Sequence, residues 1–301
     1  MIVLESHKVM EPTSNVRLVD YCIGLFPQLP TRNAVKKAMK RGEIVLNGEV
    51  GRTGLWVKQL DVIQLIDPRN KLPKPFPLEI DVVHEEDGFA VVFKPAGLVV
   101  SGNLFRTLEN ALIDQLSKSK AADALKWARP VHRLDGATSG LVILAKTLSA
   151  HHHFGDQFAT RKIQKEYHAI VQGIPNDQKI TIEVDGKQAE STLTVLSSVP
   201  SLQNGHLSLV KLEPKTGRTH QLRIHCAEIG HPIVGDQLYG EQGNIMKHKG
   251  LFLAATSLDF EHPITREKVT ISASIPTKFT ALLERETRRF ERFTQAEKSS
   301  N

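Results

Sequence analysis

The stretch VHRLDGATSGLVILAK, residues 131–146, decides the fold. Residues 141–145 are an uninterrupted apolar run of strand length, rich in branched side chains, which predicts a buried strand. Residues 132–140 are polar and rich in turn formers, and their one acid, Asp135, follows shortly after Arg133. Catalytic side chains are often found on a loop that a buried strand supports rigidly. Asp135 is therefore a candidate nucleophile, and the alternative is that it only caps the turn through nearby amides.

Length and composition predict a globular protein with a main domain and a smaller one. The chain has 301 residues, 40% of them hydrophobic, and a formal net charge of +6. This basic excess is compatible with a nucleic-acid partner but does not require one. Cys22 and Cys226 lie far apart, which excludes a disulfide framework and predicts a reducing compartment. The chain begins with no signal-peptide pattern and has no apolar window of about 18 residues, so we expect a cytoplasmic protein with no membrane span.

Residues 15–67 predict a small module that precedes the main domain. Thr31 can cap a helix over residues 32–41, and a short strand follows and ends in the turn Asn47-Gly48. We expect residues 1–14 to form a separate N-terminal segment, either irregular or at an edge, and the proline-rich residues 68–77 to be a linker. The helix carries five cations and no acid: Arg32, Lys36, Lys37, Lys40 and Arg41.

The order helix, basic helix, strand, Asn-Gly turn, strand resembles the small RNA-binding module first described in a small-subunit ribosomal protein. The resemblance implies that the basic helix contacts RNA. A solvated helix face is the more common explanation of a charge run, but five cations without an acid favour phosphate contact. The sequence departs from the module at Lys58-Gln-Leu-Asp61, where a glycine usually precedes the aspartate, so a different turn is expected there.

Residues 78–280 predict the main domain, and residues 281–301 a charged helical tail. Many short strands with a few interspersed helices, and no regular alternation of the two, predict an α+β fold with a largely antiparallel, mixed sheet. We expect helices at residues 108–118 and 149–161. We expect strands at residues 163–171, 180–185, 190–196, 207–213, 251–258 and 268–275.

Four polar motifs lie in this domain in a fixed order. They are KPAGL at residues 94–98, HRLDGATSG at 132–140, KEY at 165–167, and GRTHQLRIH at 217–225 followed by GHPIVGDQLYG at 230–240. Together they resemble the motifs of the RluA-type pseudouridine synthases, many of which carry the N-terminal module as well. The sequence departs from that family at residues 101–103, where members often have His-Pro. The resemblance implies an isomerase that converts uridine in RNA to pseudouridine.

The resemblance assigns three catalytic residues. Asp135 matches the aspartate that attacks the uridine, since a carboxylate can form a covalent intermediate and then leave; attack on the ring or on the sugar stays open. Arg223 matches the arginine that pairs with this acid and keeps it charged, the alternative being a surface arginine on a helix. Tyr167 matches a tyrosine that stacks on uracil and takes the proton from carbon 5, the alternative being a core tyrosine.

The same motifs assign the residues that bind substrate. The uridine must leave its stack, which costs a few kcal/mol, and Arg133 would fill the gap that it leaves. His132 either contacts substrate or is a structural hydrogen bonder. Arg218, His220 and Gln221 either touch the RNA backbone or brace their loop. No cofactor is expected because the rearrangement is redox-neutral, and the tract at residues 151–153 has no acid or cysteine at metal-ligand spacing.

Two other functions remain open at this point. One is a non-catalytic RNA-binding or ribosome-assembly protein on the same scaffold. The other is a hydrolase that uses Asp135, which would require a second carboxylate; Glu166 is near, but it should face away from Tyr167 on the strand. As substrate we expect large-subunit ribosomal RNA first and transfer RNA second. The sequence indicates no obligate protein partner and does not fix the oligomeric state.

Overall fold

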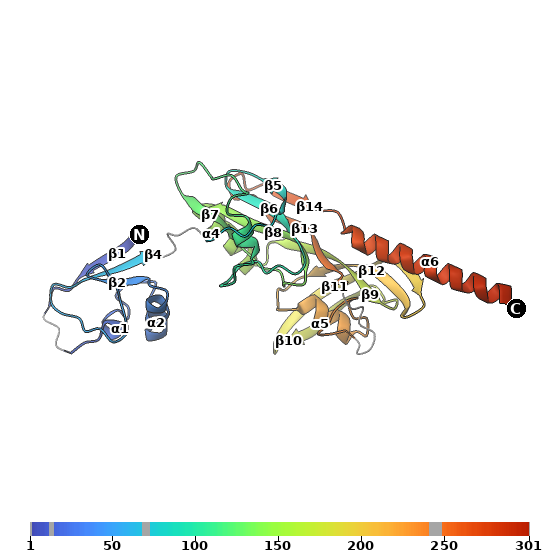
Figure 1. Ribbon diagram of the computed structural model, residues 1–301, viewed down its shortest axis with the longest axis horizontal. Helices are drawn as coiled ribbons and strands as arrows, with labels where there is room; N and C mark the ends of the chain where they lie inside the picture. The colour runs from blue at the N-terminus through green and yellow to red at the C-terminus, as the bar shows by residue number, and fades with distance from the viewer. Residues whose placement is uncertain (1, 12–14, 68–72, 241–248, 301) are drawn as a thin grey trace. The chain divides into compact units, whose positions relative to one another are not determined.

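The structure is a computed structural model that describes residues 2–11, 15–67, 73–240 and 249–300 (Figure 1). The chain divides into two compact units, Met1–Leu72 and Pro73–Asn301. The first unit has an antiparallel sheet in the order β1-β4-β2-β3. Its elements are β1 (Ile2–Lys8), α1 (Leu18–Tyr21), α2 (Arg32–Lys40), β2 (Ile44–Leu46), β3 (Glu49–Val50) and β4 (Val62–Asp67).

Helix α2 forms as predicted. The Oγ1 atom of Thr31 accepts a hydrogen bond from the N–H of Ala34 at 3.2 Å, and the apolar face of the helix is buried in the core of the unit. Within the predicted N-terminal segment, residues 2–8 form β1, which pairs antiparallel with β4 and so belongs to this sheet. The predicted linker falls partly on residues 68–72, which lie outside the described residues. Leu60 adopts a left-handed backbone with φ 71°, the conformation that a glycine before Asp61 would favour.

The second unit is built on a large mixed sheet, as the α+β prediction requires. The strand order is β10-β11-β12-β9-β13-β8-β6-β5, with β14 paired to β13 and β7 to β8; only the β13–β8 pair is parallel among the described pairs. The strands are β5 (Asp81–Glu85), β6 (Phe89–Lys94), β7 (Ala124–Pro130), β8 (Ser139–Thr147), β9 (Gln164–Gln172), β10 (Gln178–Val184), β11 (Lys187–Ser201), β12 (Gly205–Pro214), β13 (Leu253–Glu261) and β14 (Lys268–Ser272). The helices are α3 (Leu108–Ala111), α4 (Leu148–Ala159), α5 (Gln221–Glu228) and α6 (Thr277–Ser300).

Strand β8 lies in the interior of this sheet, and every one of its residues is buried. Its side chains alternate between two apolar clusters, so both faces of the strand are covered. Gly140 directly precedes the apolar run of β8 and has φ 124°, and a Cβ atom there would lie 2.2 Å from the carbonyl oxygen of Ala255 on β13. A glycine is therefore required where β8 and β13 run side by side.

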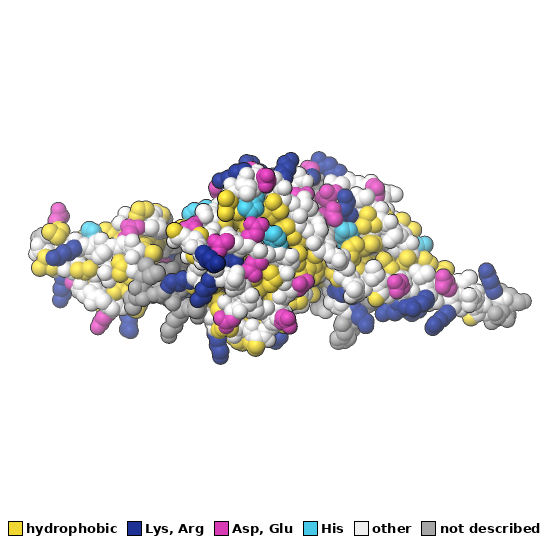
Figure 2. Space-filling model, turned by 90° about the horizontal axis from the view of Figure 1, so that it is seen from above, with side chains coloured by type: hydrophobic (Ala, Val, Ile, Leu, Met, Phe, Trp, Pro, Cys, Tyr) yellow, Lys and Arg dark blue, Asp and Glu magenta, His cyan; other side chains and the backbone are white. Residues whose placement is uncertain are grey.

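Helix α6 corrects the predicted boundary at residue 280. It begins at Thr277 and packs against β11, and Leu282 and Leu283 are buried in the core of the unit, so the predicted tail is continuous with the domain. Figure 2 shows Lys and Arg side chains in a row along this helix, at the right of the view. In the described part of the chain, no helix is long and apolar enough to cross a membrane.

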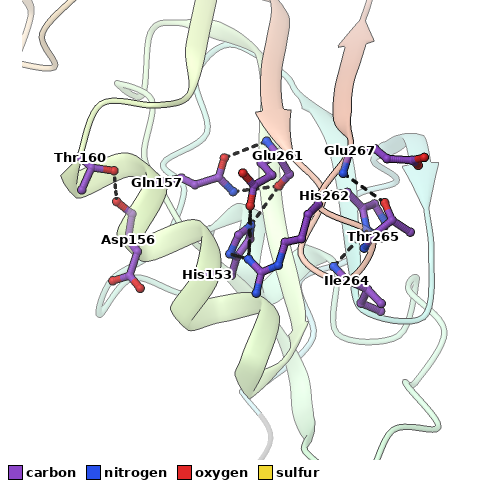
Figure 3. Close-up of polar contacts among 10 residues, drawn as sticks. His153, Asp156, Gln157, Thr160, Glu261, His262, Ile264, Thr265 and Glu267 are labelled. Atoms are coloured by element: carbon purple, nitrogen blue, oxygen red, sulfur yellow. Dashed lines mark hydrogen bonds and ion pairs between the residues drawn. The ribbon is translucent and has the colours of Figure 1, made fainter.

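Helix α4 also forms as predicted, whereas the helix predicted at residues 108–118 is only the single turn α3. Gln157 of α4 exchanges two hydrogen bonds of 2.8 Å with the backbone N–H and carbonyl of Glu261, at the end of β13 (Figure 3). The Nε2 atom of His153 lies 3.1 Å from the same carbonyl. His153 thus helps to fix α4, and no group of residues that the structure describes there has the make-up of a metal site.

Candidate active site

Asp135 lies on the loop that enters β8, and a buried lysine, Lys94, stabilises this loop through hydrogen bonds. The Nζ atom of Lys94 donates to the carbonyls of Leu98 (2.7 Å), Pro95 (3.0 Å) and Gly136 (3.3 Å). Burial lowers the pKa of Lys94 to about 8, and the negative charge of Asp135 opposes this shift. The sequence identified the KPAGL turn but not this bond to the residue next to Asp135. Lys94 thereby fixes the backbone that presents the acid.

Asp135 faces a cavity of about 520 Å3. Its walls come from the loop before β8, from the end of α4 with the start of β9, and from the segment that leads into α5. The cavity brings together all the residues of this unit predicted for catalysis or substrate binding: His132, Arg133, Asp135, Tyr167, Arg218, His220, Gln221 and Arg223. Three motifs far apart in the sequence therefore form one site.

Arg223 is held mainly by Asp236, which lies in the motif at residues 230–240. Its Nε and Nη2 atoms donate to the two carboxylate oxygens of Asp236 at 2.7 and 2.8 Å, and its Nη1 lies 3.9 Å from Oδ2 of Asp135. Burial alone would lower the pKa of Arg223, but Asp236 and then Asp135 outweigh it, so the pKa is raised. Burial would likewise raise the pKa of Asp236, but Arg223 and two backbone N–H groups lower it. A charged guanidinium is thus fixed beside Asp135.

His220 places a second nitrogen near the acid. Its Nε2 lies 3.7 Å from Oδ2 of Asp135, and its Nδ1 lies 3.0 Å from the hydroxyl of Tyr239. The residue adopts a left-handed backbone with φ 57°, a strained conformation that is often retained at functional sites. Gln221, in contrast, is buried and braces the loop, because its amide bonds to Thr216, to the N–H of Arg218 and to two further groups on β11. The Nε atom of Arg218 is buried without a partner among the described residues.

The structure favours the structural alternative for His132. Its Nε2 accepts a hydrogen bond of 3.0 Å from the N–H of Ile143, and its ring packs on Phe158 with centroids 4.6 Å apart. Burial, and then the charge of Lys165, lower the pKa of His132 to about 3, so the imidazole is neutral. Arg133 is exposed, and its side chain bonds to no residue in the described ranges.

Tyr167 enters the cavity from β9. Burial, and then the nearby charge of Asp135, raise the pKa of its phenol, which therefore keeps its proton at neutral pH. Glu166 points to the other face of β9, where it lies 3.8 Å from His168 and 3.9 Å from Lys211. Among the described residues that line the cavity, Asp135 is the only acid. The second carboxylate that a retaining glycosidase needs is therefore missing from this cavity.

Two of the five cations predicted for RNA binding on α2 have acidic partners from outside the helix. Arg32 pairs with Asp20, and the Nε atom of Arg41 bonds to Glu43 at 2.6 Å. The other three bond to no side chain in the part of the chain that the structure describes: Lys36, Lys37 and Lys40.

Comparisons with known proteins agree with this geometry. A family model described as RNA pseudouridylate synthase matches residues 88–228. The ribosomal large subunit pseudouridine synthase D of Zymomonas mobilis is 37% identical over 253 residues, which covers 73% of this chain and 77% of that protein. The dual-specificity RNA pseudouridine synthase RluA of Haemophilus influenzae is 35% identical over 219 residues, 65% of this chain and 94% of that protein. The solved structure of human RNA pseudouridylate synthase domain containing 4 has a TM-score of 0.55 and 26% identity, and covers 68% of this chain and 92% of that one.

Proposed function

The chain belongs to the RluA family of RNA pseudouridine synthases, which makes it an isomerase, and from this premise we propose that Asp135 is its nucleophile and large-subunit ribosomal RNA its substrate. The observation that supports Asp135 as the nucleophile is that it is the only acid among the described residues of the cavity, which Arg223 and Tyr167 also line. Support for the substrate comes from the relative named for the large ribosomal subunit.

The reaction needs a uridine that has left its stack, because neither carbon 5 nor the sugar is accessible to a carboxylate inside a helix. The exposed, unpaired Arg133 is suited to occupy the space that the base leaves. In the isomerisation the bond from N1 to C1′ breaks and the bond from C5 to C1′ forms. The proton on C5 is lost and N1 gains one, so the atoms balance without a cofactor.

Arg223 then acts on the charge of Asp135, and Tyr167 acts on the proton of C5. Arg223 stabilises the carboxylate of Asp135 whenever it is free, before attack and after release. Tyr167 is a neutral phenol, so it transfers the C5 proton as a relay, accepting that proton while giving up its own. This step requires the hydroxyl of Tyr167, whereas packing in the core would require only its ring.

The three unpaired lysines of α2 would attract RNA to the first unit. We expect that changing Lys36, Lys37 and Lys40 together to Gln lowers RNA affinity and reduces the salt slope of binding by roughly 0.7–0.9 per lost phosphate contact. Isomerisation at saturating RNA should be unaffected, because these residues do not line the cavity. An unchanged salt slope would contradict this role.

Pseudouridine mapping of total cellular RNA, with and without this gene, tests the function. We expect the deletion to lose one or more sites in large-subunit ribosomal RNA, restored by the wild-type gene but not by Asp135→Ala. Loss of sites in transfer RNA instead would contradict the proposed substrate. If no site were lost, or if Asp135→Ala restored them, the proposed function would be wrong.

A further inference from the structure

Three cations that line the cavity take no part in the proposed chemistry and were not predicted as site residues: Arg161, Lys165 and Lys215. No side-chain hydrogen bond or ion pair joins any of them to a residue in the described ranges. They come from two segments of the cavity wall, since the first two follow α4 and the third precedes α5. The only negative charge among the described lining residues is that of Asp135. The cavity therefore has an excess of positive charge with no protein counter-ion.

Lys165 lies inside the cavity on the same strand face as Tyr167, because side chains two residues apart on a strand point the same way. The loop of Gly217 closes over it, since a Cβ atom at Gly217 would lie 3.6 Å from its Nζ. Burial lowers the pKa of this lysine. A partly buried ammonium without a counter-ion is unfavourable, and an anionic ligand would remove that cost.

Arg161 occupies a position where glycine is the usual residue. Helix α4 ends in a Schellman motif: the N–H of Arg161 bonds to the carbonyl of Phe158 at 3.2 Å, and the N–H of Lys162 to that of Gln157 at 2.9 Å. Arg161 is the left-handed residue of this motif, with φ 58°. This backbone conformation disfavours an arginine relative to a glycine.

Hydrogen bonds also hold the end of α4 in place, so the backbone of Arg161 has a defined position. Figure 3 shows Gln157 bonded to Glu261 at the end of β13, and the hydroxyl of Thr160 bonded to the carbonyl of Asp156 at 2.7 Å. Arg161 follows directly after Thr160. A cation on such a support can bind a ligand at a defined place rather than act as a mobile surface charge.

We propose that Arg161, Lys165 and Lys215 form a phosphate-binding site that holds the RNA backbone beside the extruded uridine. Extrusion rotates the backbone and carries a flanking phosphate towards the carboxylate of Asp135, which repels it. Cations on the walls neutralise that phosphate, with Lys165 as the inner contact and the exposed Lys215 as the outer one. The site rests on the proposed function, since it requires a uridine bound in this cavity.

The test uses full-length Arg161→Gly and Lys165→Gln, with Lys162→Gln as matched control. Lys162 adjoins Arg161 and is exposed, but it does not line the cavity. Binding of an unmodified transcript of large-subunit ribosomal RNA is measured over a range of salt, together with KM and kcat. We expect each cavity variant to reduce the salt slope by roughly 0.7–0.9 and to raise KM, and the control to do neither. Arg161→Gly should leave Tm unchanged or higher, because glycine accepts its backbone conformation.

Equal slopes for wild type, Arg161→Gly and Lys165→Gln would overturn the proposal. So would an equal loss in Lys162→Gln, which would indicate diffuse attraction of RNA to this side of the protein. If Lys165→Gln fails to fold, Lys165→Arg keeps the charge and should bind with the wild-type slope, and Arg161→Gly still decides the question. Failure of the proposed function is distinguishable, because wild type itself would then make no pseudouridine in this transcript.

Discussion

Replacing Arg223 with lysine tests whether the shape of this cation matters as well as its charge. Its Nε and Nη2 atoms bond to Asp236 while Nη1 faces Asp135. A lysine keeps the charge but offers one compact ammonium, which cannot serve both carboxylates in this geometry. We expect Arg223→Lys to fold, to bind RNA and to isomerise uridine slowly.

The structure sets the size of the effect. At an effective dielectric constant of about 20, unit charges 3.9 Å apart attract by about 4 kcal/mol, which bounds what Arg223 contributes to the charge of Asp135. Losing all of this would slow the reaction about 10³-fold. Losing one of the two charged bonds to Asp236 should lower the free energy of unfolding by about 1.5–3 kcal/mol.

Single-turnover formation of pseudouridine, with thermal unfolding measured alongside, tests both values. Arg289→Lys is a matched control, because Arg289 on α6 also bonds to a buried carboxylate, that of Glu286 at 3.1 Å, but does not line the cavity. We expect the rate of Arg223→Lys to fall roughly 10²–10³-fold and that of the control to stay within about twofold of wild type. A folded Arg223→Lys with the wild-type single-turnover rate would refute this reasoning.

Three further variants test other parts of the structure. Gly140→Ala should lower the free energy of unfolding, measured in urea, by about 3 kcal/mol, because its Cβ atom would meet the backbone of Ala255. The control is Gly155→Ala on α4, where a Cβ atom has open space, and this variant should be about 0.5–1 kcal/mol more stable than wild type. The pKa of Lys94 is about 8 in the folded protein against an ordinary value of 10.5, so between these pH values the unfolded chain binds more protons. The stability of wild type relative to Lys94→Met should therefore rise by about 3 kcal/mol as the pH rises from 8 to 10.5, and a flat profile would exclude a buried ammonium. Tyr167→Phe should keep RNA affinity but slow single-turnover isomerisation about 10²–10⁴-fold. An unchanged rate would contradict the proposal that the hydroxyl of Tyr167 relays the C5 proton.

Local patterns predicted those parts of the fold that local interactions determine. Helix α2 follows from its cap and its apolar spacing, and β8 from its apolar run. Strand β1 was predicted only as an irregular or edge segment, because its partner, β4, lies more than fifty residues later and the pairing makes it an edge strand. The helix after Thr107 has the predicted cap and start, but its predicted end was wrong, because apolar spacing alone does not determine where a helix ends and α3 stops after one turn.

The same difference between local and distant interactions applies to the site residues. The three residues that the motifs predict as catalytic, Asp135, Tyr167 and Arg223, line one cavity, although no local signal showed that Asp236 is the main partner of Arg223. Arg161 was missed because an arginine in a helix end is ordinary in sequence and unusual only through its positive φ. Whether a cation has a counter-ion depends on residues distant in the sequence, so it becomes visible only in three dimensions.

The central claim is that the carboxylate of Asp135 attacks the uridine. Its most direct test is single-turnover pseudouridine formation by purified Asp135→Asn, which keeps the side-chain shape but removes the nucleophile. Asp156→Asn is the matched control, because Asp156 is exposed on α4 and does not line the cavity. We predict that Asp135→Asn binds the RNA but forms pseudouridine roughly 10³-fold more slowly or worse, while the control keeps the wild-type rate. Pseudouridine formation by Asp135→Asn at the wild-type rate would contradict the mechanism.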